Sequence, residues 1–357
     1  VHRQVVRKAV VDRDIPIDPV VTLYHVAVRE PDMHEPSSDL RRLYEALANA
    51  GAPKNLDISV HLLTRLQSVL RAGDGVDNAS KWRVTAAVHR DGRILALWPA
   101  KKNGLYGMAV DVGSTTMSAQ LCDLTSGEVV ASAGIMNPQI RFGEDVMSRV
   151  SYSMMNAGGA GEMTEAVREA LNELAVAVCE DAEITTDDIL DIVLVGNPIM
   201  HHLILGIDPV ELGGAPFALT TDMGTNIPAR QLGLFLNDGA QAYILPCIAG
   251  HVGADTAAVA LSEAPDEDEG LTFIVDVGTN AEMLLGNQDR ILAASSPTGP
   301  AFEGAQISSG QRAAPGAIER VRIDRSTLDP KFQVIGNELW SDNPDFAEAT
   351  KATGVTG

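Results

Sequence analysis

The sequence has few of the residues, and none of the long apolar runs, that mark several protein classes. It contains three cysteines in 357 residues, Cys122, Cys179 and Cys247, an odd number without a close pair. This spacing excludes a zinc site and the four-cysteine pattern of a [2Fe–2S] cluster, and it suits reduced thiols. No run approaches the roughly 18 apolar residues of a membrane span, and the start lacks the apolar segment of a signal peptide. We therefore expect a cytoplasmic protein without a membrane partner.

Positive charge is scarce as well. Lys and Arg number 27 against 48 Asp and Glu, which gives a formal net charge of -21. Such a surface repels the phosphates of nucleic acid, so we exclude a nucleic-acid partner. Hydrophobic residues at 45% and charged residues at 21% are close to globular averages, and the length leaves room for two or three domains.

The first hundred residues predict a small α+β domain after an extended arm. Residues 1–19 mix basic, apolar and proline residues without a period, and we interpret them as a linker. Apolar spacing and capping residues predict a strand, two helices and a hairpin, at 20–28, about 38–50, about 58–71 and around Asp91-Gly92. We assign residues 20–100 to this domain.

Two similar stretches follow, at 104–265 and 271–357, on either side of an acidic run. Each begins with a predicted meander of three strands. In the first stretch the strands are expected at 106–111, 117–123 and 128–135. The helices and the strand that follow are expected at 143–156, 162–181, 192–195, 198–205 and 253–262. In the second stretch the strands are expected at 271–276, 281–285 and 290–294. The order of the first stretch is therefore β-β-β-α-β-α.

An internal repeat at the start of both stretches is the strongest signal. Residues 108–116 read Met-Ala-Val-Asp-Val-Gly-Ser-Thr-Thr, and 165 residues later 273–280 read Phe-Ile-Val-Asp-Val-Gly-Thr-Asn. Glycine permits a sharp turn that brings backbone N–H groups close to an anion, and the hydroxyl groups add donors. A single such turn is an ordinary hairpin turn, whereas two copies at equivalent places predict phosphate binding.

Both copies carry an aspartate, which phosphates would repel unless a cation lay between them. We therefore expect Asp111 and Asp276 to hold hydrated Mg²⁺. The other residues expected to contact nucleotide phosphates are the glycine, hydroxyl and amide residues of the two loops: Gly113, Ser114, Thr115, Thr116, Gly278, Thr279 and Asn280.

The duplication resembles the actin, Hsp70 and sugar-kinase superfamily, in which two ribonuclease-H-like halves close on ATP and Mg²⁺. The resemblance implies an α/β fold: a duplicated ribonuclease-H-like fold, truncated in its second half and preceded by a small α+β domain. The string Val195-Gly196-Asn197 resembles the connecting motif that faces the attacking water. By this resemblance Asn197 and Asp276 are the expected catalytic residues.

Four strings narrow the resemblance, and they lie at 196–203, 245–255, 276–282 and 296–304. Over about residues 20–357 the chain is similar to the reductive activators of corrinoid proteins. The resemblance implies an ATP-hydrolysing enzyme that returns Co(II) to Co(I) in a corrinoid protein of a methyltransferase system. The implied cofactors are ATP and Mg²⁺, and the implied partner is the corrinoid protein or its methyltransferase. A homodimer is also compatible with the resemblance.

The chain departs from that family at both ends. Family members carry an N-terminal ferredoxin domain with a [2Fe–2S] cluster, for which this sequence has no cysteine pattern. They also continue beyond the equivalent of Gly357 into an adenosine-binding motif. We interpret the chain as a fragment, expect the cluster only in a full-length protein, and expect the isolated fragment to be inactive.

Several alternatives stay open. A small-molecule kinase of the same superfamily and a non-redox ATP-binding scaffold or chaperone-like module are the rival functions. His201-His202 are interpreted as packing residues rather than metal ligands, and Asp255 either assists Mg²⁺ or begins a helix. Three methionines in the helix expected at 143–156 are interpreted as core residues. The segment 295–310 is either a surface loop or a site where a corrinoid or its protein approaches closely.

Overall fold

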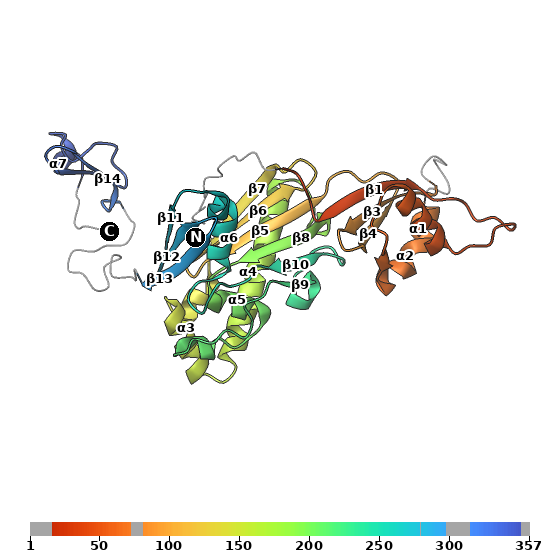
Figure 1. The fold of residues 1–357 in the computed structure, drawn as a ribbon, viewed down its shortest axis with the longest axis horizontal. Coiled ribbons are helices and arrows are strands. Elements are labelled where there is room, and N and C mark those ends of the chain that lie inside the picture. The colour runs from red at the N-terminus through yellow and green to blue at the C-terminus, as the bar shows by residue number, and fades with distance from the viewer. Residues whose placement is uncertain (1–15, 73–80, 279, 298–314, 351–357) are drawn as a thin grey trace. The chain divides into compact units, whose positions relative to one another are not determined.

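The computed structural model describes residues 16–72, 81–278, 280–297 and 315–350 (Figure 1). The chain forms two compact units, Val1–Ser262 and Glu263–Gly357. Thr279 and most of the segment 295–310 lie outside the described residues, as do residues 1–15 of the expected linker. Among the described residues, no helix combines the length and the apolar character that crossing a bilayer requires.

The first unit begins with a small α+β region. Its sheet has the order β1-β3-β4-β2, with strands at Val21–Ala27, Arg83–His89, Arg93–Pro99 and Asp57–Ile58. Two helices, α1 (Asp39–Asn49) and α2 (Val60–Arg71), bury their apolar stripes against this sheet. The predicted helices and the predicted hairpin are confirmed. Gly92 turns the hairpin at a φ of +98°, and a Cβ there would clash with the carbonyl oxygen of Asn55.

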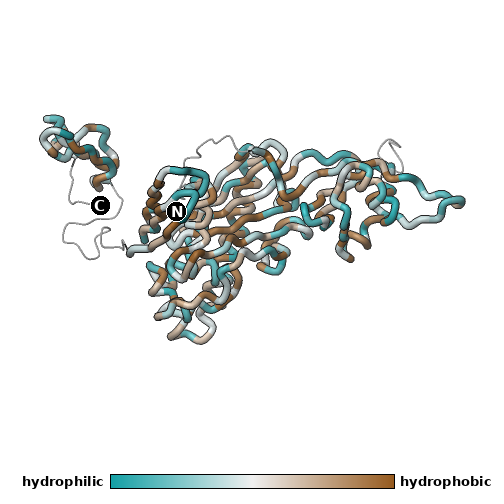
Figure 2. The backbone as a smooth tube through the Cα atoms, viewed as in Figure 1, coloured by the Kyte–Doolittle hydropathy of each residue, from teal (hydrophilic) through white to brown (hydrophobic). Residues whose placement is uncertain are grey.

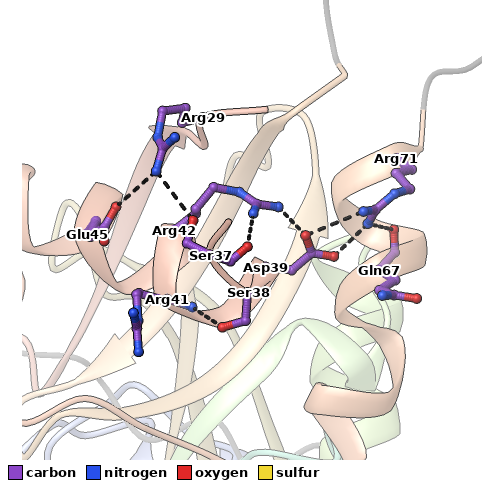
Figure 3. Close-up of polar contacts among 9 residues, drawn as sticks. All are labelled: Arg29, Ser37, Ser38, Asp39, Arg41, Arg42, Glu45, Gln67 and Arg71. Carbon is purple, nitrogen blue, oxygen red and sulfur yellow. Dashed lines mark hydrogen bonds and ion pairs between the residues drawn. The ribbon is translucent and has the colours of Figure 1, made fainter. Parts of the chain in front are cut away.

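A polar cluster around Asp39 ties the two helices together (Figure 3). Ser38 caps α1 by accepting a hydrogen bond from the backbone N–H of Arg41 at 3.2 Å. Arg71 of α2 reaches Asp39 with an N–O distance of 2.7 Å, and Arg42 also pairs with Asp39. The hydrogen bond from Arg71 is the main reason why the pKa of Asp39 lies below its ordinary value. Both guanidinium groups also lie over the ring of Trp82.

A six-stranded sheet follows, in the order β7-β6-β5-β8-β10-β9 (Figure 1). Its strands in chain order are β5 (Tyr106–Val112), β6 (Thr116–Asp123), β7 (Val129–Met136), β8 (Ile189–Val195), β9 (Thr225–Pro228) and β10 (Gln241–Ile244). The meander β5-β6-β7 is antiparallel, and β5, β8 and β10 are parallel to one another. The predicted meander and β8 are confirmed. Strands β9 and β10 were not predicted, because four residues are too short for a visible alternation.

Helices cover the two faces of this sheet unequally. On one face α4 (Gly159–Asp181) and α5 (Pro198–Leu205) pack against buried hydrophobic side chains of β5, β6 and β8. Figure 2 colours the backbone by residue hydropathy and shows hydrophobic residues along these strands. Helix α6 (Ala254–Glu263) lies against the opposite face, where Ala258 packs on Val193 and Val195. Short 3-10 helices connect these elements, at Pro138–Phe142, Thr186–Asp188, Val210–Gly213 and Ala229–Leu232.

Helix α3 (Val146–Met155) differs from its predicted role. The three methionines expected in the core, Met147, Met154 and Met155, are exposed. The inward face of α3 instead carries Arg149 and Val150, both buried. The interpretation of the methionines as core residues was wrong, because Val146, Val150 and Tyr152 form the face of α3 that packs on the core.

The second unit repeats the meander. Strands β11 (Thr272–Val277), β12 (Asn280–Asn287) and β13 (Arg290–Pro297) form an antiparallel sheet, as predicted. The short 3-10 helix Pro265–Glu267 that precedes them was not predicted. A separate hairpin, β14 (Ile318–Ile323) and β15 (Pro330–Val334), and the short helix α7 (Phe346–Ala349) follow, and neither was predicted.

Candidate nucleotide-phosphate site

Parallel pairing brings two of the predicted site residues to the same edge of the six-stranded sheet. Strand β5 pairs with β8 so that Asp111 lies opposite Val195, and Asn197 follows two residues later. Two glycines allow the chain segments to meet closely at this edge. A Cβ on Gly196 would lie 2.8 Å from the carbonyl oxygen of Val112, and one on Gly253 would lie 2.6 Å from the carbonyl oxygen of Gly196.

The first phosphate loop occupies residues 113–116, between the paired residues Val112 and Met117. Three of its backbone carbonyl groups accept hydrogen bonds from neighbouring residues. The side-chain amide of Asn137 donates to the carbonyl oxygen of Gly113 at 2.8 Å, and the backbone N–H of Asn137 donates to that of Thr115 at 2.8 Å. The guanidinium of Arg149 donates to the carbonyl oxygen of Ser114.

This set of hydrogen bonds fixes the direction of the loop's N–H groups. In a trans peptide the C=O and the following N–H point in opposite directions. Because the carbonyl groups of residues 113–115 face the protein, the N–H groups of residues 114–116 face the other way. A Cβ on Gly113 would lie 2.5 Å from the carbonyl oxygen of Thr116, so this tight form of the loop requires glycine. N–H groups that point away from these carbonyl-side contacts can face an anion, so the loop is compatible with phosphate binding.

Arg149 and Asn137 are site residues that the sequence did not reveal. Asn137 follows β7 and caps a 3-10 helix by accepting from the N–H of Gln139 at 2.9 Å. Arg149 is fully buried in α3, and burial lowers the pKa of its guanidinium from 12.5 to about 10. The Asn-Pro pair signals a turn, but no local pattern marks Arg149 as a partner of the loop.

Asn197 is partly committed to a structural role. It is the N-cap of α5, and its Oδ1 accepts from the N–H groups of Ile199 and Met200 at 3.1 and 3.0 Å. Its amide N–H₂ is thus the part of the side chain that can orient a water molecule. Asp255 lies in the first turn of α6, which agrees with its interpretation as a helix-start residue.

The two neighbouring histidines of α5 are packing residues. His202 donates from Nδ1 to the carbonyl oxygen of Pro198 at 2.9 Å, and its Nε2 accepts from the N–H of Thr220 at 3.0 Å. His201 is fully buried, and burial lowers its pKa to about 4. Across the part of the chain that the structure describes, no group of three His, Cys, Asp or Glu side chains can hold a metal ion.

A pocket of about 350 Å³ lies beside Asp111 on the face of the sheet that α6 covers. Its lining includes Asp111 and Gln120 but is otherwise mainly apolar, with Val195, Leu245 and Leu261. The pocket suits an apolar side chain or part of a ligand rather than a strongly hydrated group.

The second phosphate loop lies in the other unit and is one residue shorter. Residues 278–280 connect the paired residues Val277 and Ala281. Asp276 lies opposite Glu282, whose Oε1 accepts from the Ser295 hydroxyl at 3.2 Å. Two carboxylates in one cross-strand pair repel each other unless a cation lies near, which fits the predicted Mg²⁺. Thr279 lies outside the described residues, so its predicted contact stays a prediction.

The cysteines do not fit an iron–sulfur cluster. Cys122 lies in β6, Cys179 in α4 and Cys247 after β10, and all three are free thiols. Burial raises the pKa of Cys179 to about 11 and that of Cys247 to about 12. A cluster takes thiolate ligands, ordinarily four, so these three protonated thiols are unsuited to hold one.

Comparisons with known proteins show what the whole chain resembles. Three family models cover nearly the whole chain: the RACo linker region at 10–104, the RACo middle region at 106–267, and the C-terminal ASKHA domain of RACo at 270–357. "Corrinoid activation enzyme RamQ" of Eubacterium limosum is 33% identical over 327 residues, which are 90% of this chain and 52% of that protein.

A second curated relative is the "[Co(II) methylated amine-specific corrinoid protein] reductase" of Methanosarcina barkeri. It is 28% identical over 223 residues, which are 60% of this chain and 40% of that protein. The solved structure of a "Reductive activator for corrinoid,iron-sulfur protein" matches with a TM-score of 0.76 and 31% identity, over 93% of this chain and 52% of that one. The chain thus spans about half the length of the relatives it matches, and the expected fold class is confirmed.

Proposed function

Because the chain belongs to the RACo family of corrinoid reductive activators, we propose that it forms part of an ATP-dependent activator that returns Co(II) to Co(I) in a corrinoid protein. The observation that carries this proposal is the first phosphate loop, whose three carbonyl groups are held inward so that its N–H groups face outward. The partner is a corrinoid protein of a methyltransferase system, and the activity belongs in the cytoplasm.

The chain's own residues would act on the nucleotide phosphates as follows. The N–H and hydroxyl groups of residues 113–116 donate to phosphate oxygens, and Asp111 holds Mg²⁺ through water. Asp276, Gly278, Thr279 and Asn280 are proposed for the same role in the second loop. Asn197 orients the attacking water with its amide N–H₂. Bound Mg²⁺ would neutralise phosphate charge, which these carboxylates alone would repel.

The proposed reaction moves one electron from a [2Fe–2S] cluster of the full-length protein to Co(II), which becomes Co(I). Moving one electron against 100 mV costs about 2.3 kcal/mol. A gap of a few hundred millivolts therefore needs several kcal/mol, which differential binding of nucleotide to two conformations can supply. ATP would change the conformation of the activator rather than react with cobalt.

A direct test uses the full-length protein with a chemical reductant and a corrinoid protein in the Co(II) state. Co(I), followed by its absorbance, is expected to form with MgATP and to fail to form without nucleotide. Equal Co(I) formation without any nucleotide would refute the proposal. Transfer of phosphate to a small molecule in place of Co(I) formation would favour the kinase alternative.

A further inference from the structure

A buried positive charge lies directly behind the first phosphate loop. Arg149 comes from α3 and is shielded from solvent. Its Nη2 donates to the carbonyl oxygen of Ser114, in the middle of the loop. Its Nε donates to the carbonyl oxygen of Gly143 at 3.1 Å, and Nη1 donates to the side chain of Gln139 at 3.3 Å.

All of these acceptors are neutral. Among the described residues, no carboxylate makes an ion pair with Arg149. Asp145 favours the charged guanidinium through space, but its Oδ1 accepts from the N–H of Ser148 at 2.7 Å as the cap of α3. A buried charge without a paired counter-ion is costly, because removal from water is repaid only in part by neutral acceptors.

Another buried arginine, Arg42, is paired with a carboxylate, as buried charges usually are. Arg42 is similarly buried, and its guanidinium pairs with the carboxylate of Asp39, as Figure 3 shows. Arg149 is equally buried, but its guanidinium contacts a backbone carbonyl group of the first phosphate loop where Arg42 contacts a carboxylate. The missing counter-ion of Arg149 is therefore best supplied by an anion on the outer side of that loop.

We propose that Arg149 is a positioning residue for a nucleotide polyphosphate. It holds the Ser114 carbonyl group inward, and its charge attracts the phosphates across the loop. Asn137 completes the support by holding the carbonyl groups of Gly113 and Thr115. This inference rests on the proposed function, because it assumes that the first loop binds nucleotide.

Two possible roles of Arg149 can be distinguished: attraction of phosphates by its charge, and maintenance of the loop's shape. Removal of the charge weakens binding of ligands that carry phosphates, whereas binding of adenosine, which has none, is unchanged. A role confined to loop shape or fold stability would not distinguish ligands by charge in this way.

The experiment measures binding of MgATP and of adenosine to the full-length protein by calorimetry at fixed salt. Arg149→Gln is expected to weaken MgATP binding about 10- to 100-fold, as loss of a charge-assisted contact does, and to leave adenosine binding within twofold. Arg149→Lys keeps the charge and is expected to recover most of the lost MgATP affinity. The matched control is Arg168→Gln, because Arg168 of α4 also donates to a backbone carbonyl, that of Ile204, at the far end of α5.

Three results would overturn the proposal: unchanged MgATP affinity in Arg149→Gln, equal weakening of MgATP and adenosine, or a lysine variant as weak as the glutamine variant. If Arg149→Gln does not fold, Arg149→Lys decides alone, since a loss beyond tenfold in that variant contradicts a role for the charge. Failure of the unaltered protein to bind MgATP would instead remove the proposed function itself.

Discussion

The two phosphate loops have nearly the same sequence but very different surroundings. In the first copy Met108, Val110 and Val112 are 2%, 2% and 0% exposed. Their counterparts in the second copy, Phe273, Val275 and Val277, are 61%, 43% and 74% exposed. The paired strands form in both copies, so the local motif is sufficient for strand pairing but does not provide the side chains that bury the strands.

Other parts of the chain supply that cover. The first copy is packed by α4 and α5 and is held from behind by Asn137 and Arg149. The copies also differ across the hairpin, because Asp111 lies opposite Ser118 whereas Asp276 lies opposite Glu282. The comparison teaches that a repeated motif marks equivalent chemistry, while the support of each copy must be found separately.

The largest effect is expected from substitutions that test whether the second phosphate loop, whose strand is exposed, is essential for Co(I) formation. In the full-length protein, Asp276→Asn should lower ATP-stimulated Co(I) formation by at least about 100-fold, because the proposed Mg²⁺ anchor is lost. Asp111→Asn should do the same. The measurement is the rate of Co(I) formation, with iron content checked in parallel. Asp289→Asn, on the turn between β12 and β13, is the control that should stay active. An active Asp276→Asn variant would show that only the first copy works.

A smaller effect is expected on the pH dependence of stability, which tests whether Asp191 in the six-stranded sheet is shielded from water. Asp191 of β8 lies opposite Gly107 of β5, and burial raises its pKa to about 7. The folded state thus holds a proton that the unfolded state, with a pKa near 3.8, releases. The free energy of unfolding should therefore fall as the pH rises from about 4 to about 7.

Asp191→Asn removes this penalty and should stabilise the first unit at pH 8 by up to about 4 kcal/mol, since each pKa unit corresponds to about 1.4 kcal/mol. Urea unfolding at pH 5 and pH 8 measures the effect, which should be small at the lower pH. A variant with the same pH dependence as the parent would show that Asp191 is hydrated rather than enclosed.

The smallest effect is expected on stability, when the equivalent valines Val110 and Val275 of the two copies are each replaced by alanine. Val110→Ala should destabilise the first unit by about 1.5–3 kcal/mol, because it removes buried apolar surface and leaves a cavity. Val275→Ala should change the stability of the second unit by less than about 0.5 kcal/mol, as surface substitutions do. Denaturant unfolding followed at Trp82 for the first unit and Trp340 for the second measures both changes. Equal costs would mean that the second copy is covered as well as the first.

The sequence predicted those elements whose signals are local. Both meanders, the two helices of the small region and the hairpin at Gly92 each show their period or turn within a dozen residues, and the structure contains them. The short strands β9 and β10 were missed. The support of the first loop was also missed, because Asn137 and Arg149 lie 24 and 35 residues from the carbonyl groups that they hold. No local pattern predicts such contacts, whereas the cap formed by Asn197 could have been read from the Pro that follows it.

The small α+β region packs closely against the six-stranded sheet. Lys102 pairs with Asp188 at 2.5 Å and His61 with Asp238 at 3.0 Å, while Arg93 donates to Gln241. A Cβ on Gly239 would clash with the carbonyl oxygen of Leu95, so the two backbones touch. The small region is therefore in direct contact with the sheet that carries the first phosphate loop. We expect any rotation of the sheet that carries the first phosphate loop to move the small region with it.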